Sequence, residues 1–223
     1  YERALSEAQT EVLDLDLRLS ADGIPVVIHD ERVDNISEQS GLVSELTFAE
    51  LKSLDAGYEF TVDGGDSFPY RGQGLTIPSL EEVLAALDGT GELSGGSTPF
   101  LNIELKVASP TLETQVVALL RRYDLLSRTC VGSIEVGSAA RIKREEPGLC
   151  TFHSKPSALC MGLDGLTSGN TGLCPEHDVL EMPAPILLGP MGQVFLDQAF
   201  ELGIPVIAVD PAEDDDLRAL LEL

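Results

Sequence analysis

The chain has 223 residues, in which 14 Lys and Arg stand against 38 Asp and Glu, for a formal net charge of −24. This length allows one large α/β domain with a sizeable core. A surface this acidic repels nucleic acid and anionic membranes, so both are excluded as partners. It also repels an anionic substrate, unless a cation sits in the binding site. The sequence contains no apolar run of membrane-spanning length.

The first strand predicted along the chain is Val12–Leu17, where apolar and polar residues alternate with period 2. Leu13, Leu15 and Leu17 share one face, and the other face carries Val12, Asp14 and Asp16. Asp22-Gly23 is a turn signal, and the extended run Ile24–Ile28 follows it and ends at His29. Because no helix separates the two runs, we expect an antiparallel hairpin.

The segment from about 31 to 78 is predicted to be an insertion after the second strand. It contains the capping box Thr47–Glu50, which opens a short helix, and the long loop Asp55–Ile77, rich in glycine and aromatic residues. A loop of this length inside a compact domain is usually functional or partly disordered. A second capping box, Ser79–Glu82, opens the next helix.

A second strand with a polar face is predicted at Phe100–Lys106, where Asn102, Glu104 and Lys106 alternate with apolar residues. Ser109-Pro110 then begins a helix. Further strands are predicted near Thr129–Gly132, Leu149–Phe152, Val179–Met182 and Val206–Val209. Helices are predicted at Tyr1–Gln9 and near Val136–Arg144, Phe195–Leu202 and Asp215–Leu223. This alternation predicts a single α/β domain over residues 1–223, either a barrel or a doubly wound sheet.

The two polar strand faces bring carboxylates together. If both strands are parallel strands covered by helices on their apolar side, the acids face a barrel interior or cleft and need a cation. Oxygen ligands favour Ca²⁺ or Mg²⁺, and His29 is a candidate general acid or base beside the ion. The residues alone leave one alternative open, in which both polar faces are solvated and His29 is a surface histidine.

The four cysteines leave the redox state open. Cys130 lies in the apolar run RTCVGS and is predicted to be a buried free thiol. Cys160 and Cys174 could close a glycine-rich loop or stay reduced, and the partner of Cys150 is left open. The acid excess, with only four lysines, is typical of an extracellular, periplasmic or high-salt setting.

Several motifs in one order carry a resemblance to a known family. The stretch DLDLRLSADGIPVVIHDERVDNISEQSGLVSELTFAELKSLDAGYEF, then DGGDSFPYRGQGLTIPSLEEVL, then LNIELK, resembles the glycerophosphodiester phosphodiesterase family. VGSI, LEMP and ELGIPVIAVDPAEDDDLRALL resemble its later strand and helix units. The resemblance implies a TIM (β/α)8-type barrel whose site lies at the carboxyl ends of the strands.

The resemblance also implies roles for individual residues. Asp14, Asp16 and Glu104 would hold a divalent cation, Ca²⁺ or Mg²⁺; His29 would be a catalytic acid or base; Lys106 would contact the phosphate of a small phosphodiester. The implied reaction begins with attack by the neighbouring glycerol hydroxyl and ends in glycerol 3-phosphate and an alcohol. The head group stays open.

The chain also departs from the family pattern. It begins after the strand that carries His-Arg-Gly, Asp14 stands where the family has Glu, and it stops before the eighth strand. We therefore expect a barrel incomplete at both ends, with open edges that invite self-association. The alternative function is a non-catalytic domain of this family with a structural or assembly role. A related phospholipase D-type lyase is disfavoured because the insertion is of the phosphodiesterase kind.

Overall fold

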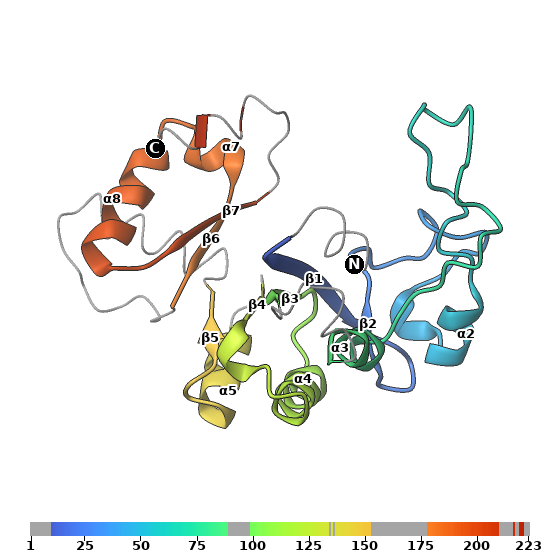
Figure 1. Ribbon diagram of the computed structural model, residues 1–223, viewed down its shortest axis with the longest axis horizontal. Helices are drawn as coiled ribbons and strands as arrows, with labels where there is room; N and C mark the ends of the chain where they lie inside the picture. Colours follow the sequence, from blue (N-terminus) through green and yellow to red (C-terminus); the bar gives the residue numbers. More distant parts are fainter. Residues whose placement is uncertain are drawn as a thin grey trace.

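The computed structural model describes residues 10–88, 99–133, 135, 137–152, 178–209, 216 and 219–220 (Figure 1). The helix predicted at Tyr1–Gln9, the loop Cys160–Cys174 and most of the helix predicted at Asp215–Leu223 lie outside these residues.

The chain's first polar strand, β1 (Val12–Leu19), forms the predicted hairpin with β2 (Pro25–Val27). The two strands pair antiparallel, with Leu17 opposite Val27. In the turn, the amide of Gly23 donates to the carbonyl of Ser20 over 2.9 Å. Gly23 takes a φ of 79°, a backbone conformation that glycine adopts without steric cost.

Parallel strands continue the sheet on the other side of β1. The order is β2-β1-β3-β4-β5, in which the new members are β3 (Phe100–Leu105), β4 (Thr129–Ser133) and β5 (Cys150–Thr151). A parallel bridge between Phe152 and Val179 leads on to a separate parallel pair, β6 (Leu180–Pro183) and β7 (Val206–Val209). Within the described ranges, these six parallel strands do not close into a ring.

Helices alternate with the strands, as predicted. The α-helices are α2 (Phe48–Ser53), α3 (Leu80–Asp88), α4 (Pro110–Arg122), α5 (Ser138–Glu145), α7 (Ala184–Leu187) and α8 (Gly192–Leu202), and the short 3₁₀ helices are η1 (Val43–Glu45) and η2 (Leu126–Arg128). Both predicted capping boxes are confirmed, because Thr47 and Ser79 each exchange hydrogen bonds with the glutamate three residues later. No helix within the described ranges has the length and apolar character needed to cross a membrane.

The main core lies between the sheet and helices α3 and α4, which lie on one side of it in Figure 1. Leu13, Leu15 and Leu17 of β1 are buried against apolar side chains of β3, α3 and α4. Full burial of one leucine contributes roughly 1.5–3 kcal/mol. A slip of β1 by one residue would therefore bury Asp14 and Asp16 instead, so the core fixes which face these acids occupy.

The insertion after β2 has a small core of its own. Its members come from β2 and the following segments: Val26, Ile28, Val33, Val43, Leu51, Leu54 and Ile77. Beyond this core the loop 55–77 projects away from the sheet (Figure 1). In the loop, the guanidinium carbon of Arg71 lies 4.0 Å from the ring centroid of Tyr58 and 3.8 Å from that of Phe68.

One sequence prediction is wrong: Cys130 is not a free thiol but forms a disulfide with Cys150. The two residues are opposite each other in the parallel pairing of β4 and β5, with their Cα atoms 4.4 Å apart. Spacing along the chain does not reveal this pairing, because the helix α5 lies between the strands and only their register brings the two cysteines together.

We predict that the Cys130–Cys150 disulfide stabilises the fold by about 3 kcal/mol, the loop-closure value for a cross-link across 20 residues. Urea unfolding of the protein with and without reductant measures this difference. The double variant Cys130→Ala/Cys150→Ala should unfold like the reduced protein and ignore the reductant. Reductant sensitivity that persists in this variant would assign the effect to Cys160 and Cys174 instead.

Gly132 of β4 lies directly beneath a buried aromatic ring. A Cβ atom built on Gly132 would lie 2.1 Å from ring carbons of Phe152, whose side chain is almost fully buried. Gly132 is also opposite Glu104 in the sheet register. The absence of a side chain at this position therefore lets Phe152 pack beside the strand that carries Glu104.

We predict that Gly132→Ala destabilises the protein by roughly 1–3 kcal/mol, because overpacking forces the ring or the strand to move. Chemical denaturation measures the loss, and adding Phe152→Leu should recover part of it. Gly148→Ala is the matched control, since the nearest atom to a Cβ there is 3.9 Å away. Equal losses in the two glycine variants would contradict the steric explanation.

Candidate active site

The polar faces of β1 and β3 lie side by side and form two layers of charged and amide side chains. Asp14 is opposite Asn102 in the parallel register, and Asp16 is opposite Glu104. The predicted acids Asp14, Asp16 and Glu104 therefore share one face of the sheet, as the period-2 pattern indicates. Lys106 follows Glu104 on this face, just beyond the end of β3.

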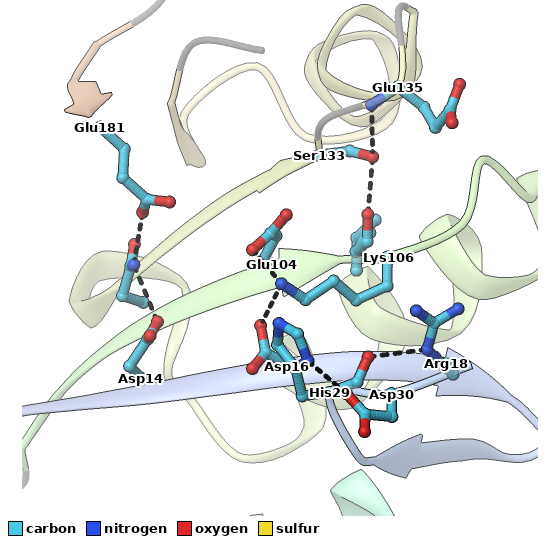
Figure 2. A network of polar contacts seen from close by, with 12 residues as sticks. Asp14, Asp16, Arg18, His29, Asp30, Glu104, Lys106, Ser133, Glu135 and Glu181 are labelled. Atoms are coloured by element: carbon cyan, nitrogen blue, oxygen red, sulfur yellow. Dashed lines mark hydrogen bonds and ion pairs between the residues drawn. The ribbon is translucent and has the colours of Figure 1, made fainter. Parts of the chain in front are cut away.

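Lys106 lies between two of the predicted cation ligands (Figure 2). Its Nζ atom lies 3.0 Å from Oδ1 of Asp16 and 2.5 Å from Oε2 of Glu104. All three side chains are largely sheltered from solvent, with 13% of Lys106, 24% of Asp16 and 15% of Glu104 exposed. The ammonium group thus neutralises part of the acidic charge on this face.

The electrostatics of this face follow from burial and from the crowding of like charges. Burial opposes the charge on Lys106, but its bonds to Glu104 and Asp16 outweigh that effect and raise the lysine pKa, so the side chain is charged at neutral pH. Burial also raises the pKa of Asp14, and the negative charges of Asp16 and Glu104 raise it further. One lysine does not balance the acids gathered here.

A fourth acid, Glu181, joins the cluster from β6 of the separate parallel pair. The amide nitrogen of Asn102 donates to Oδ1 of Asp14 over 3.0 Å and to Oε2 of Glu181 over 2.7 Å. Burial is the first cause that raises the pKa of Glu181, to about 7, with further contributions from the charges of Asp14 and Glu104. Glu181 is therefore partly protonated near neutral pH.

Neither Asn102 nor Glu181 was among the site residues predicted from the sequence. The pattern held a signal for both. Asn102 alternates on the same strand face as Glu104, and Glu181 is the charged residue between the apolar Leu180 and Met182 of a predicted strand. The sequence does not show that β6 lies close enough to β3 for Glu181 to reach Asn102.

His29 lies at the rim of this cluster, directly after β2. The amide of Ile28 donates to the carbonyl of Asp16 over 2.9 Å, which places the following His29 beside the first polar strand. The imidazole is 68% exposed, and its Nδ1 lies 2.8 Å from Oδ1 of Asp30. Figure 2 shows His29 and Asp30 next to Asp16.

Asp30 orients the His29 ring. A hydrogen bond from Asn35, followed by the bond to His29, lowers the pKa of Asp30, so this carboxylate is ionised and acts only as an acceptor. The Nδ1 of His29 must then be the donor, which leaves Nε2 free to exchange a proton. Arg18 also donates to the main-chain carbonyl of His29 over 2.9 Å and fixes the backbone there.

The donor chemistry of the cluster fits a hard divalent cation. Carboxylate oxygens are the ligands that Ca²⁺ and Mg²⁺ prefer, and the buried carbonyl oxygen Oδ1 of Asn102 has no hydrogen-bond partner in the described part of the chain. No three Asp, Glu, His or Cys side chains among the described residues are close enough to enclose an ion by themselves. The roles of Asp14, Asp16, Glu104, Lys106 and His29 thus stay predictions.

Comparison with known proteins places this arrangement in a family. The model of the "Glycerophosphoryl diester phosphodiesterase family" matches residues 2–156. A glycerophosphodiester phosphodiesterase of Caldanaerobacter subterraneus subsp. tengcongensis is 34% identical over 152 residues, which cover 67% of this chain and 56% of the relative. One from Bacillus altitudinis is 32% identical over 150 residues, covering 66% and 55%. The chain spans a little over half the length of these relatives.

Solved structures show the same fold. A glycerophosphodiester phosphodiesterase from Agrobacterium tumefaciens superimposes with a TM-score of 0.71 at 21% identity, covering 98% of this chain and 83% of the other. An Oleispira antarctica phosphodiesterase in complex with the product sn-glycerol-3-phosphate gives a TM-score of 0.70 at 22% identity, covering 99% and 82%.

The prediction of a TIM-type barrel, not closed within the described strands, is confirmed by these neighbours. The family model covers both polar strands, the hairpin and the insertion. This chain belongs to the glycerophosphoryl diester phosphodiesterase family.

Proposed function

We propose that the chain carries the active site of a divalent-cation-dependent phosphodiesterase that hydrolyses glycerophosphodiesters to glycerol 3-phosphate and an alcohol. The observation that carries the proposal is the cluster of four acids and one lysine on the polar face of β1, β3 and β6, with His29 at its rim. The relatives' names and the product in the Oleispira antarctica structure support the same substrate class.

In this proposal Asp14, Asp16 and Glu104 hold Ca²⁺ or Mg²⁺. The bound ion would supply positive charge for the oxygens of the phosphodiester and for the charge that develops in the transition state. It would also overcome the repulsion that a chain of net charge −24 exerts on an anionic substrate.

The chain's own residues bind the phosphate and transfer the proton. Lys106 contributes a point charge to a phosphate oxygen. The free Nε2 of His29 exchanges a proton, either with the attacking glycerol hydroxyl or with the leaving alcohol. Asp30 holds the ring through Nδ1, so that Nε2 is the nitrogen that exchanges the proton. The neighbouring glycerol hydroxyl forms a bond to phosphorus as the bond to the alcohol breaks, and water then opens the cyclic phosphate.

The pairing of Lys106 with Asp16 and Glu104 favours one alternative function. A lysine that satisfies its acidic neighbours is also what a non-catalytic domain of this family would keep for structural reasons. The two functions differ in whether cation and substrate displace the lysine from these carboxylates.

We also propose that the protein works in an extracellular or periplasmic setting. The disulfide Cys130–Cys150 supports this, because disulfides persist in oxidising compartments and are rare in the cytosol.

We predict that the protein, produced at its full encoded length, releases glycerol 3-phosphate from glycerophosphocholine when Ca²⁺ or Mg²⁺ is added, and that a chelator stops the release. His29→Ala should lower kcat by about 100-fold or more through loss of proton transfer. Glu104→Ala should abolish turnover at ordinary cation concentrations. A coupled assay for glycerol 3-phosphate measures all of these rates.

His177→Ala is the matched control for this assay, because His177 lies outside the motifs that carry the resemblance. It should leave turnover unchanged. Full-length protein that shows no turnover with either ion would instead favour the non-catalytic role.

We predict that Lys106→Met binds the cation more tightly but turns over substrate more slowly. The ammonium repels an incoming cation and occupies two carboxylates, so its removal should lower Kd about tenfold. A tenfold change in Kd corresponds to about 1.4 kcal/mol, which is about a third of the roughly 4 kcal/mol between unit charges 4 Å apart near a protein surface. Loss of the phosphate contact should reduce kcat/KM at the same time.

Calorimetric titration with Ca²⁺ measures the change in affinity. Lys52→Met, which removes a surface lysine paired with Glu82, is the matched control. Weaker cation binding in Lys106→Met would show that the lysine supports the site instead of competing for it.

A further inference from the structure

Asn102 joins two acids that come from different parts of the fold. Its side chain is almost fully buried, with 3% exposed. Through its amide nitrogen it contacts Asp14 on the adjacent strand β1 and Glu181 on β6, which belongs to the separate parallel pair β6–β7. The link Asp14–Asn102–Glu181 therefore joins the five-stranded sheet to the pair β6–β7.

The orientation of this amide is fixed by chemistry. Two carboxylates face the same end of the Asn102 side chain, and only the NH₂ group can donate to both. The reversed orientation would place the carbonyl oxygen against two acids. In the observed orientation Oδ1 stays buried and unpaired with respect to the described residues, which costs roughly 1–3 kcal/mol.

An apolar residue of similar shape would fill the same space without the cost of an unpaired carbonyl oxygen. The amide of Asn102 therefore has a role beyond packing. What the amide achieves is a fixed position for the Asp14 carboxylate. The partner that holds the amide in place is Glu181, whose bond of 2.7 Å is the shorter of the two.

We propose that Asn102 and Glu181 are positioning residues for the cation site: Glu181 anchors the amide of Asn102, and Asn102 holds the Asp14 carboxylate in place. The inference rests on the proposed function, because Asp14 is a cation ligand only there. In this inference Glu181 accepts a hydrogen bond from Asn102 and does not itself bind the ion. β6 thereby supports a ligand that β1 carries.

The test is the affinity of the full-length protein for Ca²⁺, measured by calorimetric titration without substrate. Asn102→Ala and Glu181→Ala should each weaken binding by 10–100-fold, the range found when the partner of a metal ligand is removed. The double variant should be no weaker than Asn102→Ala alone, because the two residues act in one chain. Glu181→Gln keeps an acceptor oxygen of the same reach and should restore most of the affinity.

Glu113→Gln is the matched control. Glu113 is a buried glutamate that lies on α4 and pairs with Arg141, so its loss should affect stability and leave the cation affinity unchanged. Thermal unfolding of each variant without cation shows that it is folded. Glu181 lies on a partly exposed position of β6, so the comparison of its two variants decides the matter even where Asn102→Ala is poorly folded.

Two outcomes would overturn the inference while leaving the proposed function intact. If the Ca²⁺ affinity falls as far in Glu181→Gln as in Glu181→Ala, the carboxylate of Glu181 binds the ion directly. Unchanged affinity in folded Asn102→Ala would show that Asp14 needs no support. If the wild-type protein binds neither Ca²⁺ nor Mg²⁺, the proposed function itself fails and this inference fails with it.

Discussion

The rest of the structure depends on the repulsion among the acids on the polar face of the parallel sheet. Asp14, Asp16, Glu104 and Glu181 are brought together where water is partly excluded, and among the described residues Lys106 pairs with two of them, Asp16 and Glu104. Partly buried carboxylates of like charge are unfavourable unless a cation or a proton compensates. Burial, and after it the charges of the neighbouring acids, raises the pKa values of Asp14 and Glu181, and Lys106 lies between two of the acids.

Apolar packing on the opposite face of the same strands stabilises the fold against the repulsion among the acids. The leucines of β1 and β3 are packed against α3 and α4, and their burial fixes the register that points the acids the other way. The hairpin to β2 then delivers His29 beside Asp16, and the ionised Asp30 sets the direction of its ring. The apolar core and the polar cluster thus lie on opposite faces of the sheet.

Much of this arrangement could be predicted from local patterns. Period-2 alternation placed Asp14 and Asp16 on one face of a strand and Glu104 and Lys106 on one face of another, and capping boxes marked where α2 and α3 begin. These signals work because they depend only on neighbours within a few residues. The prediction for Cys130 failed because a cross-strand disulfide depends on the register of two strands separated by a helix.

By itself the sequence determined the strand faces, the hairpin, the helix starts and the family motifs, because each is encoded in short spacings along the chain. Only the tertiary structure decided which side chains meet: Lys106 between Asp16 and Glu104, Cys130 with Cys150, and Glu181 on Asn102. Each of these contacts joins residues from different strands or strand ends, and the last one also joins the five-stranded sheet to the pair β6–β7. The relative position of the two sheets arises from the packing of the strands and helices together, so no single stretch of sequence reveals it.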